Sequence, residues 1–203
     1  MRLRLLLPAV LACCLSAPLA VHAEKADRDK PMNVEADALR YDDLRQVSVF
    51  TGHVVLTKGT ILIRGARLEV RQDPDGYQYG TVTAEPGKRA FYRQKREGLD
   101  EWIEGESNVI DYDGKADRVK FIGQAELRRL RGATLADEMV GSVITYENTT
   151  DVFTVDGGPA SPRPGGRVRA VLAPREAASA PTRPATPPAQ LRPAPTLAPG
   201  ETR

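Results

Sequence analysis

Two segments of this chain, VFTGHVVLTKG at residues 49–59 and KFIGQAELRRL at residues 120–130, follow one pattern. In each, apolar and polar side chains alternate as in a strand with one buried face, and a glycine interrupts the middle. Because glycine lets a strand bend, the pattern predicts two copies of one antiparallel unit that curve at the same place. A shift of 71 residues aligns the copies without a gap and pairs Glu35 with Glu106, Tyr41 with Tyr112, Phe50 with Phe121, Gly52 with Gly123 and Leu56 with Leu127.

Turn signals separate short alternating runs through the rest of the chain body, where hardly any stretch has helical periodicity. The turn signals are DPDG at Asp73, EPGK at Glu85, YDGK at Tyr112 and VDGG at Val155. Short strands spaced by such turns predict an all-β sandwich or barrel. The segment 93–106, RQKREGLDEWIEGE, fits either a long loop or a short helix.

The first 23 residues have the composition of a secretory signal peptide, with two arginines, an apolar run and Val-His-Ala at the end. Cleavage is expected after Ala23. The run is too short to span a bilayer and keep that cleavage site, so we expect no retained anchor. A lipoprotein signal ending at Cys13 is the alternative, but it would cut the apolar run in half. Both cysteines, Cys13 and Cys14, lie in the removed segment, so the mature chain would have no thiol.

Composition divides the remaining chain into a body, residues 24–173, and a tail, residues 174–203. The tail has eight prolines in thirty residues and too few apolar groups to offset its ordering entropy, so we expect it to be disordered. From Pro159 onward there are seven Arg and two Glu, whereas residues 24–158 hold 20 basic and 25 acidic residues. A net acidic body argues against nucleic acid as a partner.

Few residues suggest catalysis. The mature chain has one histidine, His53, which is a catalytic candidate or a solvent-facing strand residue, and no Gly-x-Ser-x-Gly motif accompanies it. Asp111, Asp113 and Asp117 could belong to a calcium loop or a glycosidase pair. DYDGKAD lacks the later acidic ligand of a calcium loop, however, and a hairpin turn at Asp113-Gly114 explains it more simply. No phosphate-binding loop with Lys-Ser or Lys-Thr is present. We therefore expect no catalytic residue, cofactor or metal.

The inward phase of the repeated strands carries apolar and aromatic side chains. One interpretation is the ordinary core of a β-sandwich. The other is a binding slot, because the chain has only 5% aromatic residues and its mid-strand glycines leave space that a filled core would occupy. The residues on this phase are Phe50, Val54, Leu56, Phe91, Tyr112, Phe121 and Leu127.

The stretch MNVEADALRYDDLRQVSVFTGHVVLTKGTILIRGARLEV resembles the opening of the OstA-like family, which includes the LptA-type periplasmic proteins of lipopolysaccharide transport. PGKRAFYRQ, VIDYDGKADRVKFIGQAEL and RVRAVLAP resemble later segments of that family in the same order. His53 and Gln124 stand where the family usually has Asn. The matching positions in the opening are Met32, Val34, Glu35, Asp37, Phe50, Gly52, Val54, Gly59, Thr60, Ile61 and Ala66.

The resemblance implies a twisted, slightly open antiparallel β-jellyroll built from two similar halves. It also implies a non-enzymatic periplasmic bridge that carries lipopolysaccharide from the inner to the outer membrane, between an LptC-like inner-membrane protein and an LptD-like outer-membrane protein. The alternatives are an exported polysaccharide-active enzyme and an adhesin-like structural module. On the resemblance, lipid A would contact Met32, Val34, Phe50, Val54, Leu56, Phe91, Tyr112, Phe121 and Leu127.

An open sheet leaves unpaired backbone groups at its first and last strands, which can pair with another chain. We expect these strands in PMNVEAD and GRVRAVLAP, with Met32, Val34, Val168, Ala170 and Leu172 on them. Their sequences differ, so self-association would be heterologous and head to tail.

Overall fold

The computed structural model describes Asp27 and residues 29–174, and strands dominate this part of the chain. All strand pairs in it are antiparallel. Four strands are long: β3 (Val47–Lys58), β4 (Ile61–Gln72), β9 (Arg118–Arg131) and β10 (Thr134–Glu147). The shorter strands are β1 (Asn33–Glu35), β2 (Ala38–Asp42), β5 (Gln78–Thr83), β6 (Ala90–Lys95), β7 (Glu101–Ser107), β8 (Val109–Asp113), β11 (Val152–Asp156) and β12 (Arg169–Leu172). A 3-10 turn at Pro164–Gly166 precedes β12.

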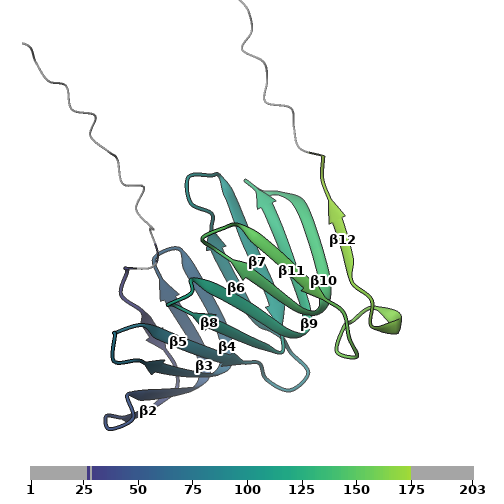
Figure 1. Ribbon diagram of the computed structural model, residues 1–203. Coiled ribbons are helices and arrows are strands. Elements are labelled where there is room, and N and C mark those ends of the chain that lie inside the picture. The colour runs from purple at the N-terminus through teal and green to yellow at the C-terminus, as the bar shows by residue number, and fades with distance from the viewer. Residues whose placement is uncertain (1–26, 28, 175–203) are drawn as a thin grey trace, which may run out of the picture. The chain divides into compact units, whose positions relative to one another are not determined.

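Each long strand pairs with different neighbours along its two halves, so the strands form two layers (Figure 1). The first layer follows the order β1-β3-β4-β6-β7-β9-β10-β12, and the second layer follows β2-β3-β4-β5-β8-β9-β10-β11. This arrangement is an antiparallel β-jellyroll, which confirms the predicted fold class. The expected signal peptide and the tail beyond Pro174 lie outside the described residues.

The repeated glycines lie where strands cross from one layer to the other. In β3, Gly52 has φ +79° and His53 has φ +46°; in β9, Gly123 and Gln124 have +76° and +50°. The strand pairing shifts register at both places, so each is a β-bulge that bends its strand. The predicted bend at one place in both copies is confirmed.

Hydrogen bonds of the backbone recur at equivalent positions of the two copies. Asp37 N donates to Gly52 O at 3.0 Å, and at the 71-residue offset Asn108 N donates to Gly123 O at 2.9 Å. The turn before each long strand repeats as well, because Arg45 N and Ala116 N each donate to an Asp carboxylate three residues earlier, at 3.1 and 2.9 Å. The two halves therefore share their bends and turns as well as their strands.

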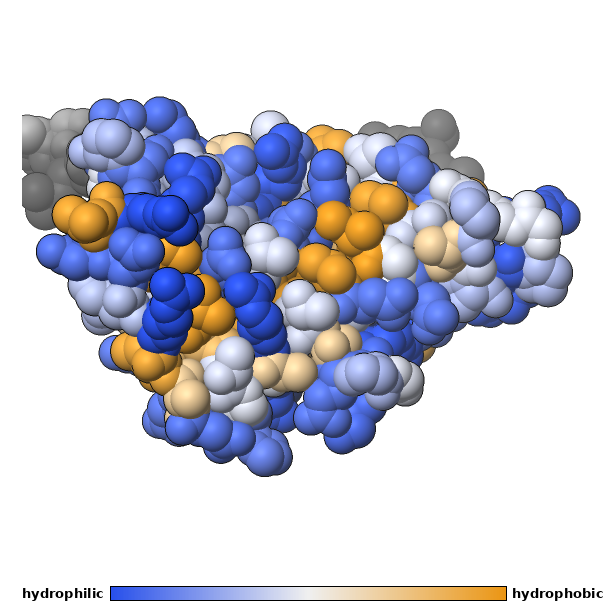
Figure 2. Space-filling model, turned by 90° about the horizontal axis from the view of Figure 1, so that it is seen from below, coloured by the Kyte–Doolittle hydropathy of each residue, from blue (hydrophilic) through white to orange (hydrophobic). Residues whose placement is uncertain are grey.

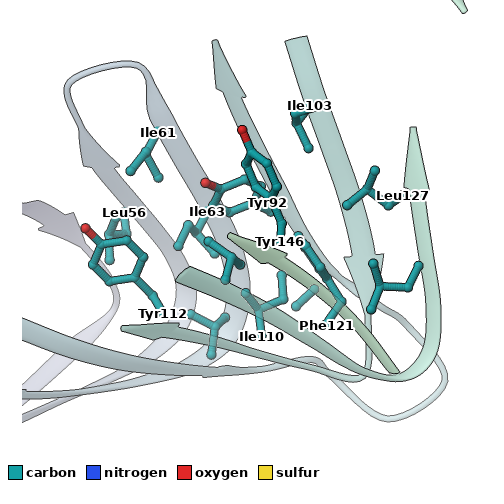
Figure 3. Packing of buried hydrophobic residues seen from close by; sticks show 14 of the residues in the cluster. Leu56, Ile61, Ile63, Tyr92, Ile103, Ile110, Tyr112, Phe121, Leu127 and Tyr146 are labelled. Carbon is teal, nitrogen blue, oxygen red and sulfur yellow. The ribbon is translucent and has the colours of Figure 1, made fainter. Parts of the chain in front are cut away.

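Apolar side chains of both layers point toward one another in the interior (Figure 3). Phe121 is fully buried and meets Tyr92 edge to face at a centroid distance of 5.5 Å, while Tyr146 stacks on Phe153 at 4.5 Å. Aromatic pairs of this kind add about 0.5–1.5 kcal/mol beyond the burial of their area. Seen from below, the surface carries apolar patches separated by hydrophilic residues (Figure 2).

Residues 93–106, for which the sequence fitted either a long loop or a short helix, belong to a β-hairpin. β6 and β7 pair from Ala90 with Ser107 to Lys95 with Trp102. Its strand character was hidden because Arg93 and Glu104 stand opposite each other on its outer face, as do Lys95 and Trp102, which gives the segment a polar composition. Arg93 lies 4.2 Å from the centroid of the Trp102 ring, so cross-strand contacts stabilise this hairpin.

We predict that Gly52→Ala lowers the free energy of unfolding by about 2–3 kcal/mol, since a left-handed backbone disfavours Cβ and the added atom would lie 2.9 Å from Asp37 Cβ. Gly87→Ala is the matched control, because Gly87 has φ +77° but open space around it. Urea denaturation of both variants should show a smaller loss for Gly87→Ala. Equal losses would mean that the close approach of Asp37 has no energetic consequence.

Candidate functional site

The candidate site is the apolar interior between the layers. Val54, Leu56, Tyr112, Phe121 and Leu127 lie there and are buried, as the strand phase predicted. A second set of predicted residues, Met32, Val34 and Phe50, is partly buried against the same cluster near the β1–β2 end. At the opposite end Met139, Phe153 and Val155 also pack on it while partly exposed. The apolar interior thus extends from the edge strand β1 at one end to the edge strand β11 at the other.

Phe91 does not lie in this interior, so its predicted inward orientation is wrong. Its neighbours Ala90 and Tyr92 are both fully buried, and side chains alternate along a strand, so Phe91 faces outward. Arg64 lies 5.9 Å from the centre of its ring. The sequence missed Tyr92 because two adjacent aromatic residues leave the phase of a short strand undetermined.

The glycines do not leave the centre of the interior empty. Gly52 and Gly123 form the bends, and Gly105, which does face inward, provides the room that the Phe121 ring fills. Side chains of Ile63, Ile110 and Ile144 are at most 1% exposed. The centre is therefore packed as in an ordinary β-sandwich, and a ligand there requires the layers to move apart.

Opposite the bends, the two layers meet along a seam closed by polar contacts. Arg96, which follows β6 in the first layer, forms an ion pair of 3.0 Å with Asp151, which precedes β11 in the second. Lys58 at the end of β3 donates a long hydrogen bond of 3.4 Å to Gln78 Oε1 at the start of β5. These contacts join the layers where the bends do not.

A cavity of about 400 Å³ opens on this seam. Asp27, Thr60, Gln94, Lys95, Arg96, Glu97, Gly98, Leu99, Asp100, Asp117 and Asn148 line it. The lining residue Gln94 connects the cavity to the apolar interior, because the hydroxyl of the core residue Tyr92 donates to Gln94 Oε1 at 2.5 Å. Burial raises the pKa of Tyr92, so this hydroxyl stays protonated and acts as a donor.

Besides Asp117, which is 8% exposed, two charged side chains of the seam are buried, Asp27 and Lys58, each with a relative exposure of 7%. The Asp27 carboxylate accepts hydrogen bonds from Thr60 N and Thr60 Oγ1, both at 2.6 Å, and from Gln94 Nε2 at 3.1 Å. The second, Lys58, has its pKa lowered by burial, and the carboxylates of Asp29, Asp27 and Asp117 partly offset this effect. Sequence reasoning missed both residues, although Lys58 falls on the inward phase of β3.

Three of the four catalytic candidates, His53, Asp113 and Asp117, have structural partners. His53 Nδ1 lies 2.8 Å from Asp37 Oδ2 at the exposed bend. Asp113 accepts hydrogen bonds from Lys115 N and Ala116 N, so it caps a turn, as predicted for this segment. Asp117 has φ +52° and accepts from Asn148 Nδ2 at 3.0 Å, so the left-handed residue of the turn is Asp117 and not Gly114. Among the residues that the structure describes, no group of His, Cys, Asp and Glu could hold a metal ion.

The sheet edges lie at opposite ends of the jellyroll. β1 and β12 are the edges of the first layer, as predicted, but β2 and β11 are edges of the second layer, which the sequence did not identify. Met32 and Val168 lie just outside β1 and β12, whereas Val34, Ala170 and Leu172 are within these strands. The 71-residue offset could have revealed β2, because its bounds map onto β8.

The fold and the site define the class of this protein. It is an antiparallel β-jellyroll whose apolar interior reaches unpaired sheet edges at both ends. Proteins of this class can bind an apolar ligand along the interior and pair with other chains at the edges. Residues 33–152 match the family described as LptA/(LptD N-terminal domain) LPS transport protein, and the chain belongs to this family. Within Asp27 and residues 29–174 no helix is long and apolar enough to cross a membrane.

Relatives with assigned names are similar over most of the chain. The lipopolysaccharide export system protein LptH of Pseudomonas aeruginosa is 31% identical over 174 residues, which cover 83% of this chain and 93% of the relative. The lipopolysaccharide export system protein LptA of Escherichia coli K12 is 32% identical over 133 residues, 65% of this chain and 68% of the relative. The crystal structure of LptH, described as the LptA-homologous periplasmic component of the lipopolysaccharide transport device, matches with a TM-score of 0.63 at 27% identity, over 73% of this chain and 99% of that one.

We predict that Lys58→Met stabilises the protein by about 1 kcal/mol at neutral pH, because a buried ammonium is replaced by an apolar side chain of similar length. The gain is fully present below the lowered pKa of Lys58 and disappears as the pH rises toward its ordinary value of 10.5. Denaturant titrations from pH 7 to 10.5 measure it. Lys120→Met on the outer phase of β9 is the control and should change stability by less than about 0.5 kcal/mol. A destabilised Lys58→Met at neutral pH would contradict the interpretation.

Proposed function

We propose that this protein is a periplasmic carrier of lipopolysaccharide, which holds the acyl chains of the lipid between its two layers and passes it along a protein bridge toward the outer membrane. The observation that carries the proposal is the apolar interior that reaches the edge strands at both ends, in a chain of the LPS transport family. Exposure of an acyl chain to water costs about 0.8 kcal/mol per methylene, so a carrier needs a continuous apolar path.

The geometry favours this function over the two alternatives. Two of the three aspartates considered for a polysaccharide-active enzyme have structural roles, because Asp113 caps a turn and Asp117 accepts a hydrogen bond from Asn148. An adhesin-like module needs no apolar interior open toward its ends. A location in the periplasm accords with the signal peptide expected at residues 1–23 and with the periplasmic assignment of LptH.

Edge pairing would connect the protein to its partners. The matched family joins LptA with the N-terminal domain of LptD, which supports pairing between like jellyrolls at their edges. We propose an LptC-like inner-membrane protein at one end, an LptD-like outer-membrane protein at the other and head-to-tail copies of this chain between them. Opposite charges support head-to-tail pairing, since Glu35 and Asp37 lie in and just after β1, whereas Arg163, Arg167 and Arg169 surround the start of β12.

A photo-crosslinking side chain at an inward position should capture lipopolysaccharide, whereas its outward neighbour on the same strand should not. Phe50 and Thr51 on β3 form one matched pair, and Tyr112 and Asp111 on β8 form a second pair. The expected yield is at least about tenfold higher at the inward member of each pair, because only that position contacts acyl chains in the interior. Equal capture by both members would show that the lipid lies on the outer surface.

Proline in β12 should distinguish the free edge from the paired edge of this strand. Neighbouring residues of a strand direct their N–H groups to opposite sides, so one of Ala170→Pro and Val171→Pro removes a donor from the outward edge and the other removes a bond to β10. We expect the unmodified protein to form concentration-dependent oligomers in sedimentation velocity. The outward variant should shift toward monomer with an unchanged Tm. Unchanged oligomers in both variants would locate self-association elsewhere.

A further inference from the structure

The Asp27 carboxylate is held by a set of converging donors in the lining of the seam cavity. Thr60 contributes its backbone N–H and its hydroxyl, and Gln94 contributes its amide N–H. Asp27 lies ahead of β1, yet its side chain is as buried as a core residue. Neutral donors surround it, and among the described residues no cation forms an ion pair with it within 4.0 Å.

The surroundings of this carboxylate are preorganised. Gly59 has φ +58°, and a Cβ there would overlap Asp27 Oδ1, so the turn needs glycine both for its backbone conformation and for room. The Tyr92 hydroxyl donates to Gln94 Oε1, which directs the amide nitrogen of Gln94 toward Asp27. Lys95 N donates to Thr60 Oγ1 at 3.1 Å and holds the hydroxyl in place. These contacts would form an anion-binding site without Asp27, because none of them depends on it.

Lys58 adds a positive charge that has no direct counter-ion. No ion pair of Lys58 within 4.0 Å occurs in the described part of the chain, and its ammonium makes one long hydrogen bond to Gln78. Asp27 is one of the carboxylates whose field acts on it. If Asp27 left the turn, an unpaired ammonium and three oriented donors would remain at the seam.

Resting on the carrier function above, we propose that the Gly59–Thr60 turn with Gln94 and Lys58 is a binding site for a phosphate group of the carried lipid, and that Asp27 occupies this site until the lipid arrives. When acyl chains lie between the layers, the phosphorylated sugars must leave through the seam, where the cavity lies. Phosphate oxygens accept the same hydrogen bonds as a carboxylate and bring more charge toward Lys58. Release of Asp27 as phosphate enters keeps the buried donors satisfied throughout the exchange.

The occupied site lowers the apparent affinity of the protein for lipid, since only molecules with Asp27 displaced can bind phosphate. Removal of the carboxylate therefore increases affinity, and only for a lipid that has phosphate. A purely structural Asp27 predicts the opposite sign, because its loss would loosen the segment before β1 and weaken binding of any lipid.

The test compares mature full-length protein and its Asp27→Ala variant by isothermal titration with bisphosphorylated lipid A in detergent micelles and with the same lipid A after removal of its phosphates. We expect Asp27→Ala to bind the bisphosphorylated lipid about tenfold more tightly and the dephosphorylated lipid with unchanged affinity. Asp156→Ala, which removes an exposed carboxylate at the end of β11, should change either affinity less than about twofold. Thr60→Val in the Asp27→Ala background should abolish the gain, with a Tm measurement to show that the domain remains folded.

Other results overturn the proposal in distinct ways. Tighter binding of both lipids by Asp27→Ala would make Asp27 a steric block of the seam and refute a phosphate site. Weaker binding of both lipids by Asp27→Ala would show that Asp27 has a purely structural role. Inorganic phosphate that binds Asp27→Ala in a phosphate titration, without any preference of the variant for phosphorylated lipid, would assign the site to free phosphate. If no variant bound either lipid, the carrier function itself would fail.

Discussion

Each of the four long strands must form backbone hydrogen bonds in both layers of the jellyroll. The remaining architecture depends on how the chain satisfies these bonds where a strand passes from one layer to the other. A strand that turns from one layer to the other must leave part of its ladder unpaired at the bend. At Gly52 and Gly123 the carbonyl groups instead accept the amides of Asp37 and Asn108, from the segments that precede β2 and β8. Each half of the chain therefore provides the partner for its own bend, which explains why the two halves are similar.

A jellyroll closed by bends on one side can stay open elsewhere. Along the strand direction, the layers are joined at the seam by side chains such as Arg96 and Asp151, whose separation breaks no backbone ladder. Across the strand direction, the ladders simply end at β1, β2, β11 and β12. Side-chain contacts cost far less to break than a sheet, so the proposed carrier could take up a lipid through the seam and pair with other jellyrolls at its edges.

The sequence predicted the features that depend on the internal repeat and on the alternation of apolar and polar side chains. The 71-residue offset and the two-residue phase were sufficient for the all-β class, the bends and the inward positions Val54, Leu56, Phe121 and Leu127. The alternation gave the wrong orientation for Phe91 because Tyr92 beside it is also aromatic. The pairing of Tyr92 with Ile63 identifies Tyr92 as the ring that enters the core. Contacts between distant segments, such as Asp27 with Gln94, have no local signature and were not predictable.

Buried charge in an apolar interior needs a reason, because well-packed apolar residues would be at least as stable there. Lys58 continues the inward phase of Val54 and Leu56, so a hydrophobic side chain would fit the strand pattern better than an ammonium does. Its position explains the exception, since β3 ends there and the interior gives way to the seam. In the proposed phosphate site, acyl chains would occupy the apolar part of the strand, and the charged sugars that they carry would meet its cationic last residue. On that proposal, a stabilising replacement at this position would remove a group that binds the carried lipid.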